Sequence, residues 1–305
     1  MRVGIYSLLL LVLLPGLSKL APSRAAANPA ASQPIDQTTD RTATDRPTTS
    51  AVPDTLFAQS AVQVLARDFS GRDISYLLLD ARSGALLASR WEKSSQPIPL
   101  GSLVKPFSAL AYAETHDFQY PSLECTGHAS GCWQRHPHGR LNIVSAISVS
   151  CNSYFRSLAE SVAPKQLFAV TQAFDLESPD PRFTAASLVG LGERWKISPL
   201  RMARAYLELL RRRDHPGVHE LLAGMQQSAQ AGTGAAVGRA LKNSGALVKT
   251  GTAPCTHVPS APADGFVIVL VPALRPEILL MIRVHGVAGA TAAETAARML
   301  AEMAE

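Results

Sequence analysis

A serine and a lysine with the spacing needed for nucleophilic catalysis lie in the first half of the chain. Ser102 precedes Lys105 by three residues, in the segment Gly-Ser-Leu-Val-Lys-Pro-Phe of residues 101–107. Side chains at positions i and i+3 of a helix share one face, so Lys105 Nζ can reach Ser102 Oγ. Pro106 suits a first helical turn and places Ser102 at a helix N-terminus, where developing negative charge is favoured. The pair predicts a serine nucleophile with a lysine base, although Ser-x-x-Lys also occurs in ordinary exposed helices.

Two later segments carry side chains that would complete such a site. Ser150, 48 residues after Ser102, can relay a proton between a base and a leaving nitrogen. Asn152 follows two residues later and can donate a hydrogen bond to an amide carbonyl of a substrate. Lys249, 99 residues beyond Ser150, adds a positive charge that disfavours protonation of Lys105 and can attract a carboxylate. We expect these side chains to converge.

The segment Lys-Thr-Gly-Thr at residues 249–252 ends a predicted strand and offers backbone groups to a substrate. Gly251, between Thr250 and Thr252, leaves an open strand edge, at which an extended peptide can pair by backbone hydrogen bonds. The backbone N–H groups of Ser102 and Thr252 could together form an oxyanion hole. We therefore expect a peptide to bind along this strand.

Composition suits a globular protein with a tail. The chain has 305 residues, of which 47% are hydrophobic and 17% charged, enough for one domain of about 200–250 residues or for two small ones. The formal net charge is only +5, and the densest basic run, residues 211–213, is typical of a solvated helix end. No aromatic residues interleave with the basic ones, so we expect no nucleic-acid partner. A preference for anionic surfaces of the cell envelope is compatible with the charge.

The N-terminus has the three parts of a secretory signal peptide. Arg2 precedes an apolar run at residues 8–14, and a small-residue site follows at residues 25–27. We expect a signal peptide at residues 1–27, with an uncleaved anchor as the alternative and the only contact with a membrane. Residues 28–54 are rich in Ala, Pro, Ser, Thr and Asp, which predicts a disordered linker. The folded domain is expected at residues 55–305, exported and periplasmic or otherwise extracytoplasmic.

Export would allow disulfides to persist. Cys125 and Cys132 enclose six residues that include two glycines, a loop that a disulfide could close. Zinc is the alternative, because three histidines lie nearby, but the spacing fits no common zinc pattern. We therefore favour a Cys125–Cys132 disulfide and expect neither a metal nor a cofactor. The histidines are His128, His136 and His138. Cys151 and Cys255 are free or paired with each other in this interpretation, and Cys151 is expected to face the core.

Hydrophobic periodicity predicts strands at both ends of the domain and helices between them. The expected helices cover residues 56–66, a segment starting at 102, and residues 141–158, 165–174, 200–210, 221–228 and 291–303; the expected strands are a hairpin within 74–91 and residues 245–252, 265–271 and 277–285. Such an order implies one sheet assembled from both termini with a helical lobe inserted. Trp133 and Trp195 are expected to be packing residues rather than platforms for a substrate.

The three segments resemble, in order, the active-site motifs of penicillin-binding proteins and serine β-lactamases. The connecting segments at residues 125–155, 190–203 and 224–234 are similar to those of penicillin-binding transpeptidase domains, so the resemblance covers roughly residues 70–300. It implies an α+β fold of the β-lactamase/transpeptidase type. That fold has a central antiparallel sheet flanked by helices, an inserted all-helical lobe, and the active site between them.

The resemblance also implies a reaction. Lys105 would deprotonate Ser102, which attacks the penultimate D-Ala carbonyl of a peptidoglycan stem peptide and forms an acyl-enzyme. An amine resolves this intermediate in a DD-transpeptidase, and water resolves it in a DD-carboxypeptidase. Ser150 would belong to the catalytic set, and Asn152 with Lys249, Thr250, Gly251 and Thr252 to the substrate-binding set. The expected ligands are stem peptides and β-lactam antibiotics; protein partners stay unidentified.

Two other functions share these motifs. A serine β-lactamase, with the oxacillinase-like kind as the main alternative, would need a group that activates water. One lactamase class uses a glutamate on a loop between the second and third motifs, and the only candidate in roughly that place is Glu177, in a segment that matches poorly. Another class relies on a carboxylated lysine, and its second motif normally ends in an apolar residue where this chain has Asn152, an amide that suits the carbonyl of a peptide. A β-lactam or muropeptide sensor that acylates without turnover is the non-enzymatic alternative. We favour the transpeptidase or carboxypeptidase.

Overall fold

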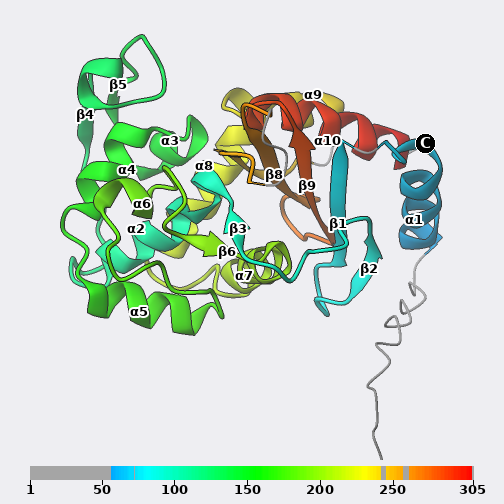
Figure 1. Ribbon diagram of the computed structural model, residues 1–305, viewed down its shortest axis with the longest axis horizontal. Helices are drawn as coiled ribbons and strands as arrows, with labels where there is room; N and C mark the ends of the chain where they lie inside the picture. Colours follow the sequence, from blue (N-terminus) through cyan, green and yellow to red (C-terminus); the bar gives the residue numbers. More distant parts are fainter. Residues whose placement is uncertain (1–55, 72, 242–244, 257–260, 304–305) are drawn as a thin grey trace, which may run out of the picture. The chain divides into compact units, whose positions relative to one another are not determined.

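A five-stranded antiparallel sheet combines strands from both ends of the chain. Its members are β1 (Ile74–Asp80), β2 (Leu86–Ser89), β7 (Leu247–Ala253), β8 (Asp264–Val271) and β9 (Ile278–His285). Their spatial order is β2-β1-β9-β8-β7 (Figure 1). β1 therefore pairs directly with β9, for example at Leu77 opposite Met281. The prediction of one sheet built from both termini is confirmed.

The computed structural model describes residues 56–303 except for positions 72, 242–244 and 257–260. The signal peptide expected at residues 1–27 and the linker expected at residues 28–54 lie outside the described residues.

The two faces of the sheet belong to two separate apolar clusters, because successive side chains of a strand point to opposite faces. In β8, Val267 and Val269 face a layer of three helices, whereas Phe266 and Ile268 face the rest of the molecule. The three helices are α1 (Leu56–Asp68), α9 (Ala235–Ala240) and α10 (Gly289–Met303) (Figure 1). With both faces covered, all eight residues of β8 are buried.

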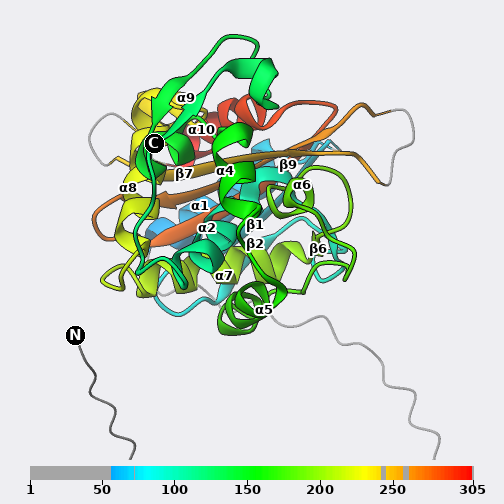
Figure 2. The same ribbon diagram turned by 90° about the vertical axis from the view of Figure 1, so that its left-hand side faces the viewer.

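The segment between β2 and α9 forms the inserted lobe, seen from its own side in Figure 2. Its helices are α2 (Lys105–Ala113), α3 (Ile143–Ser148), α4 (Asn152–Ala159), α5 (Pro164–Ala173), α6 (Ala185–Leu188), α7 (Pro199–Arg211) and α8 (Val218–Ala231), with 3₁₀ turns η1 (Gly101–Val104) and η2 (Gly127–Ser130). It also contains two short strand pairs, β3 (Ile98–Pro99) with β6 (Lys196–Ile197) and β4 (Leu123–Cys125) with β5 (Gly139–Leu141). The helical lobe was expected, but strands of two or three residues have no periodicity to reveal them.

Aromatic packing fixes the start of α2. Phe107 is fully buried and meets Phe174 and Tyr206 edge-on, at centroid distances of 5.2 and 5.5 Å. The Tyr206 hydroxyl donates a hydrogen bond to the carbonyl of Leu103 at 2.8 Å. Because Leu103 lies inside η1, this contact from α7 holds the turn that carries Ser102.

The helix expected over residues 141–158 is interrupted. α3 ends at Ser148 and α4 begins at Asn152, with Ser150 between them in a left-handed conformation, φ +52°. Such a conformation is unfavourable for a residue other than glycine, and is typical of functional sites. Cys151 caps α4 by accepting a hydrogen bond from the backbone N–H of Tyr154. Because of this interruption, Ser150 lies in the junction between the two helices and not within a helix.

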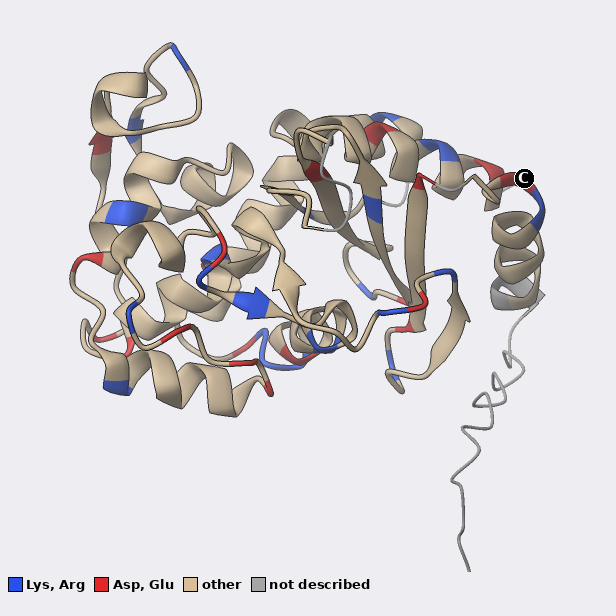
Figure 3. Cartoon of the chain, viewed as in Figure 1, with Lys and Arg blue, Asp and Glu red and all other residues tan. Residues whose placement is uncertain are grey.

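Figure 3 shows Lys and Arg positions and Asp and Glu positions on elements of both the lobe and the sheet. Among the described residues, no helix combines the length and apolar character needed to cross a membrane.

Candidate active site

A pocket of about 380 Å³ gathers most of the predicted site residues. Six of the eight line it: Ser102, Ser150, Asn152, Thr250, Gly251 and Thr252. The other two, Lys105 and Lys249, are fully buried. Their amines contact residues that line the pocket, so the structure brings all three predicted segments together.

Lys105 begins α2, and its amine is the centre of a buried polar network. Its Nζ donates to the Ser150 carbonyl at 2.7 Å and to Asn152 Oδ1 at 2.6 Å, and lies 3.3 Å from Ser150 Oγ. Burial lowers the pKa of Lys105 to about 7, while the nearby Cys151 and Cys132 act in the opposite direction. Near neutral pH a large fraction of this lysine is therefore a neutral amine, the form that a general base requires.

Ser102 lies in η1, one turn before Lys105. The α-helix predicted to start at Ser102 starts three residues later, and the preceding turn is a 3₁₀ helix, in which residues i and i+3 also stand above one another. Among the described residues, no hydrogen bond joins Ser102 Oγ to Lys105 Nζ. Catalytic hydrogen bonds commonly tighten only when substrate binds, so the spacing still allows the proton transfer.

Lys249 approaches the same serine from the sheet. Its Nζ donates to Ser150 Oγ at 2.8 Å and to the Thr250 carbonyl at 2.7 Å. Burial, and secondly the charge of Lys105, hold the pKa of Lys249 well below its usual range. The Ser150 hydroxyl thus lies between two buried amines, a position from which it can pass a proton.

Glycine lets η1 lie directly against the edge of the sheet. Gly101 has φ +57°, and a Cβ there would collide with the backbone of Thr252. A Cβ on Gly251 would lie 2.5 Å from the carbonyl oxygen of Leu100. Ser102 and Thr252 therefore border one narrow space, as an oxyanion hole built from their N–H groups requires.

Hydroxyl contacts hold the threonines of this strand. Thr250 Oγ1 donates to Thr233 Oγ1 at 2.7 Å, and the backbone N–H of Gly289 donates to Thr252 Oγ1 at 2.9 Å. These bonds orient both threonine side chains beside the pocket.

Five further residues line the pocket that the sequence interpretation did not assign to the site: Trp133, Leu191, Thr233, Ala288 and Ala290. Trp133 was expected to be a packing residue rather than a substrate platform, but it is 50% exposed and lines the pocket, and its indole N–H donates to the carbonyl of Val149. Trp195, by contrast, is buried.

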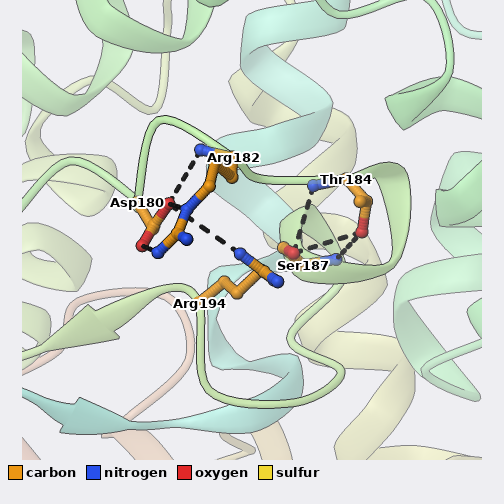
Figure 4. Close-up of polar contacts among 5 residues, drawn as sticks. All are labelled: Asp180, Arg182, Thr184, Ser187 and Arg194. Atoms are coloured by element: carbon orange, nitrogen blue, oxygen red, sulfur yellow. Dashed lines mark hydrogen bonds and ion pairs between the residues drawn. The ribbon is translucent and has the colours of Figure 1, made fainter.

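The loop that carries Leu191 is fixed by polar contacts (Figure 4). Asp180 accepts hydrogen bonds from the backbone and guanidinium of Arg182 at 2.8–3.1 Å, and Arg194 lies 3.9 Å away. The side-chain hydrogen bond from Arg182 lowers the pKa of Asp180 to about 2. Thr184 and Ser187 form a capping box at the start of α6. These contacts order the segment between Asp180 and the pocket.

The disulfide predicted between Cys125 and Cys132 is not formed. Cys125 and Cys132 are both thiols that no disulfide joins. Cys132 Sγ lies 3.7 Å from Cys151 Sγ, which is also far beyond a covalent S–S bond of about 2.05 Å. Instead, the Sγ atoms of Cys125 and Cys132 each lie 3.5 Å from His138 Nδ1. The β4–β5 hairpin brings these three residues onto Cys151, an arrangement that chain spacing alone could not reveal.

We call Cys125, Cys132, His138 and Cys151 the hairpin cluster. Its donor atoms all lie within 4.8 Å of one another. Three thiols and one imidazole are a donor set that structural zinc uses in proteins. Burial tends to raise the pKa of Cys125, but hydrogen bonds from His138 and Gly127 outweigh it and lower the pKa to about 6. The residues present therefore fit zinc, against the expectation that the chain binds no metal.

Comparison with known proteins agrees with this geometry. The family profile of the penicillin binding protein transpeptidase domain matches residues 74–304. The chain therefore belongs to the penicillin-binding protein transpeptidase family, which comprises acyl-transfer enzymes that act on peptidoglycan. No curated protein sequence matches.

Three solved structures illustrate the likeness of fold. Pseudomonas aeruginosa PBP2 in complex with WCK 5153 aligns with TM-score 0.66 and 18% identity, over 81% of this chain and 73% of that one. The transpeptidase domain of Burkholderia pseudomallei penicillin-binding protein 3 aligns with TM-score 0.61 and 15% identity, over 81% and 91%. The D,D-transpeptidase domain of a peptidoglycan glycosyltransferase from Eggerthella lenta gives TM-score 0.60 and 15% identity, over 80% of each chain. The predicted fold class is confirmed.

Proposed function

We propose that this protein is a penicillin-binding serine DD-transpeptidase or DD-carboxypeptidase that acts on peptidoglycan stem peptides through an acyl-enzyme on Ser102. The observation that carries the proposal is the buried network in which Lys105 and Lys249 both contact Ser150 below the pocket that Ser102 lines.

The first half of the reaction forms the acyl-enzyme. The neutral amine of Lys105 accepts the Ser102 hydroxyl proton while Oγ attacks the penultimate D-Ala carbonyl of the stem. The carbonyl oxygen becomes an oxyanion, which the backbone N–H groups of Ser102 and Thr252 stabilise. The proton passes from Lys105 through the Ser150 hydroxyl to the nitrogen of the terminal D-Ala. The C–N bond then breaks, D-Ala leaves as an amine, and an ester remains on Ser102.

The second half reverses these proton movements. An acceptor amine or a water molecule attacks the ester and gives its proton back through the same relay, and Ser102 Oγ leaves with a proton from Lys105. An amine yields a crosslinked peptide, and water yields a shortened stem.

Substrate orientation is divided between the lobe and the sheet. Asn152 Oδ1 accepts a hydrogen bond from Lys105, which leaves the amide N–H groups of Asn152 to donate to a substrate carbonyl. Lys249 and the hydroxyl of Thr252, which accepts from Gly289 and keeps its own proton to donate, would attract the terminal carboxylate. The edge of β7 supplies backbone hydrogen bonds to the extended stem.

The surroundings of Glu177 favour a peptidase over a β-lactamase. Glu177 accepts a hydrogen bond from the backbone N–H of Ser198 at 3.2 Å and lies 3.8 Å from the Arg201 guanidinium. It does not belong to the residues that line the pocket. Without a carboxylate to activate water, the penicilloyl ester on Ser102 should persist for minutes or longer, since each 1.4 kcal/mol missing from deacylation slows it about tenfold.

The test is labelling with a fluorescent penicillin, followed by peptide mapping and a D-Ala release assay on a D-Ala-D-Ala stem peptide. We expect one long-lived adduct on Ser102 and slow release of D-Ala. Ser102→Ala should abolish both, whereas Ser157→Ala should not, because Ser157 lies on α4 and donates only to the carbonyl of Ser153. Nitrocefin turnover at about tens per second would transfer the protein to the β-lactamases. An adduct without D-Ala release or nitrocefin turnover would make it a sensor.

Two subsidiary proposals concern location and metal content. The pattern of Arg2, the apolar run at residues 8–14 and the small-residue site at residues 25–27 supports export to an extracytoplasmic compartment. The donor set of the hairpin cluster supports a bound zinc with a purely structural role. Bound zinc would tie the β4–β5 hairpin to Cys151, the residue between Ser150 and Asn152.

A further inference from the structure

A second group of metal-type donors lies at one end of the central sheet. Asp264 is the first residue of β8 and His285 the last of β9, and the two are paired directly across the strands. His285 Nδ1 lies 2.7 Å from Asp264 Oδ1. Their side chains are only 15% and 3% exposed, so this is an interior pair rather than a surface contact.

The third member arrives from the neighbouring strand. Ala253, the last residue of β7, is paired with Asp264, and Cys255 follows two residues later. One donor atom from each of Cys255, Asp264 and His285 lies within 4.8 Å of the other two. Strands β8 and β9 and the segment after β7 thus each contribute one donor at the same end of the sheet.

The chemistry of the three donors suits one class of ligand. Thiolate, carboxylate and imidazole are the three side-chain groups that bind zinc in proteins. The thiolate and the carboxylate must be ionised to bind a metal, and Arg283 interacts electrostatically with both Asp264 and Cys255. The guanidinium itself stacks over the ring of Trp91, 4.8 Å from its centroid, so the cation is held in place beside the two anions. Two anionic donors and one neighbouring cation leave a net charge of −1 for a divalent metal to neutralise.

We propose that Cys255, Asp264 and His285 are ligands of a second divalent-metal site of the zinc class. We call it the strand-end site. The proposal is independent of the acyl-transfer reaction and of zinc in the hairpin cluster.

The location gives the strand-end site a role in shaping the substrate edge. Cys255 follows the same strand that carries Lys249 and Thr252, and the segment after His285 leads to Gly289, whose N–H donates to Thr252 Oγ1. A metal that joins Cys255 to His285 would fix both segments that border Thr252. Metal in this site therefore stiffens the edge at which the peptide pairs.

The experiment measures metal per chain on the full-length protein. Elemental analysis counts zinc, and replacement by Co²⁺ adds the absorption of a thiolate–cobalt bond. We expect Cys255→Ala to bind one equivalent less than the unaltered protein and to lose part of this absorption. The isosteric Asp264→Asn should show the same loss of one equivalent. His219→Ala is the matched control, because His219 is exposed on α8, and it should keep the full count.

The outcomes are separable. An unchanged zinc count in both Cys255→Ala and Asp264→Asn overturns the strand-end site, as does an equal loss in His219→Ala, which would indicate unspecific surface binding. Alkylation of Cys255 should also slow when zinc is added. If Cys255 is alkylated rapidly and added zinc makes no difference, the strand-end site is overturned in favour of a reactive thiol beside a His–Asp pair. Labelling of each variant by fluorescent penicillin reports whether the fold is intact.

Discussion

The two walls of the pocket differ in the chemistry that they contribute. The lobe wall, formed by η1 and the α3–α4 junction, carries Ser102, the proposed nucleophile, and the polar groups around Lys105. The sheet wall, formed by β7, carries Lys249 to Thr252 and an open strand edge. In the proposed mechanism, the side chains that move protons are thus separated from the groups that hold the substrate, and Ser150 contacts both sets. Changes in the lobe wall should therefore reduce acylation itself, and changes in the sheet wall should reduce capture.

The largest effect should come from Lys105→Ala in the lobe wall. This variant removes the proposed acceptor of the Ser102 proton, and general-base catalysis is worth about 10²–10⁴-fold. We expect the rate constant for acylation by penicillin to fall about 10³-fold at saturating penicillin. Stopped-flow fluorescence measures it, with Lys165→Ala, an exposed lysine on α5, as the control. An unchanged rate would assign the base to another residue.

In the sheet wall, Lys249→Ala should act mainly on binding. Removing one member of a buried charge interaction costs about 3 kcal/mol, which equals roughly 150-fold in affinity. We expect KM for the stem peptide to rise by that factor with a smaller change in kcat. Lys196→Ala, which removes a half-exposed lysine paired with Glu193, should leave both constants as they are. A fall in kcat with an unchanged KM would contradict the assignment of substrate binding to the sheet wall.

Loss of the proposed zinc from the hairpin cluster, which includes the cap residue of α4, should lower the free energy of unfolding. A ligand at about 100 times its Kd stabilises the fold by about 2.7 kcal/mol, or about 5 °C or more in Tm for a domain of this size. His138→Ala should lose one equivalent of zinc and show this shift in differential scanning calorimetry. His136→Ala removes an exposed histidine of the same loop and should do neither. Equal Tm values for the two variants would exclude a structural metal there.

The pH dependence of the acylation rate tests the role of Lys105 in the lobe wall in a second way. The pKa of Lys105 is lowered to about 7, and only its neutral form accepts a proton. Below pH 7 the lysine is increasingly protonated, so the rate should fall about tenfold per pH unit, and above pH 7 it should level off. Acylation rates from about pH 5 to 9 measure this profile. A rate that does not change between pH 5 and 7 would contradict a lysine base with this pKa.

The smallest effect should follow Trp133→Ala at the rim. The indole is half exposed, so truncation should cost about 1 kcal/mol of substrate contact, or roughly fivefold in KM with kcat unchanged. Phe168→Ala serves as the control, because Phe168 is another exposed aromatic residue, lies on α5 and does not line the pocket. Identical KM values for both variants would limit Trp133 to a structural role.

The motifs could be predicted because their chemistry depends on residue type and local spacing. Strands β7, β8 and β9 and helix α7 were also within reach, since their apolar periods are long and Ser198 with Pro199 marks a helix start. The interruption at Ser150 was not, because the apolar pattern continues through it. It depends on contacts of Lys105 and Lys249, residues 45 and 99 positions away in the sequence.

The hairpin cluster shows the same limit more clearly. Cys125 and Cys132 are close in sequence, and a local interpretation therefore paired them. Of the three nearby histidines the structure selects His138, the residue before β5, and it adds Cys151 from the cap of α4. Only the packing of the hairpin on α4 reveals that four donors share one centre.

Pairing of β1 with β9 has a consequence for how the chain folds. Leu77 lies opposite Met281, 204 residues later in the sequence. Closing so long a loop is entropically costly, and proteins rich in such distant contacts fold slowly. β1 and β2 alone form a two-stranded hairpin, which is marginally stable in water. The apolar surface of this hairpin stays exposed until β9 pairs with β1. An exposed hairpin of this kind is prone to pair with other chains, so we expect the yield of folded protein to depend on how quickly the last quarter of the chain follows the first.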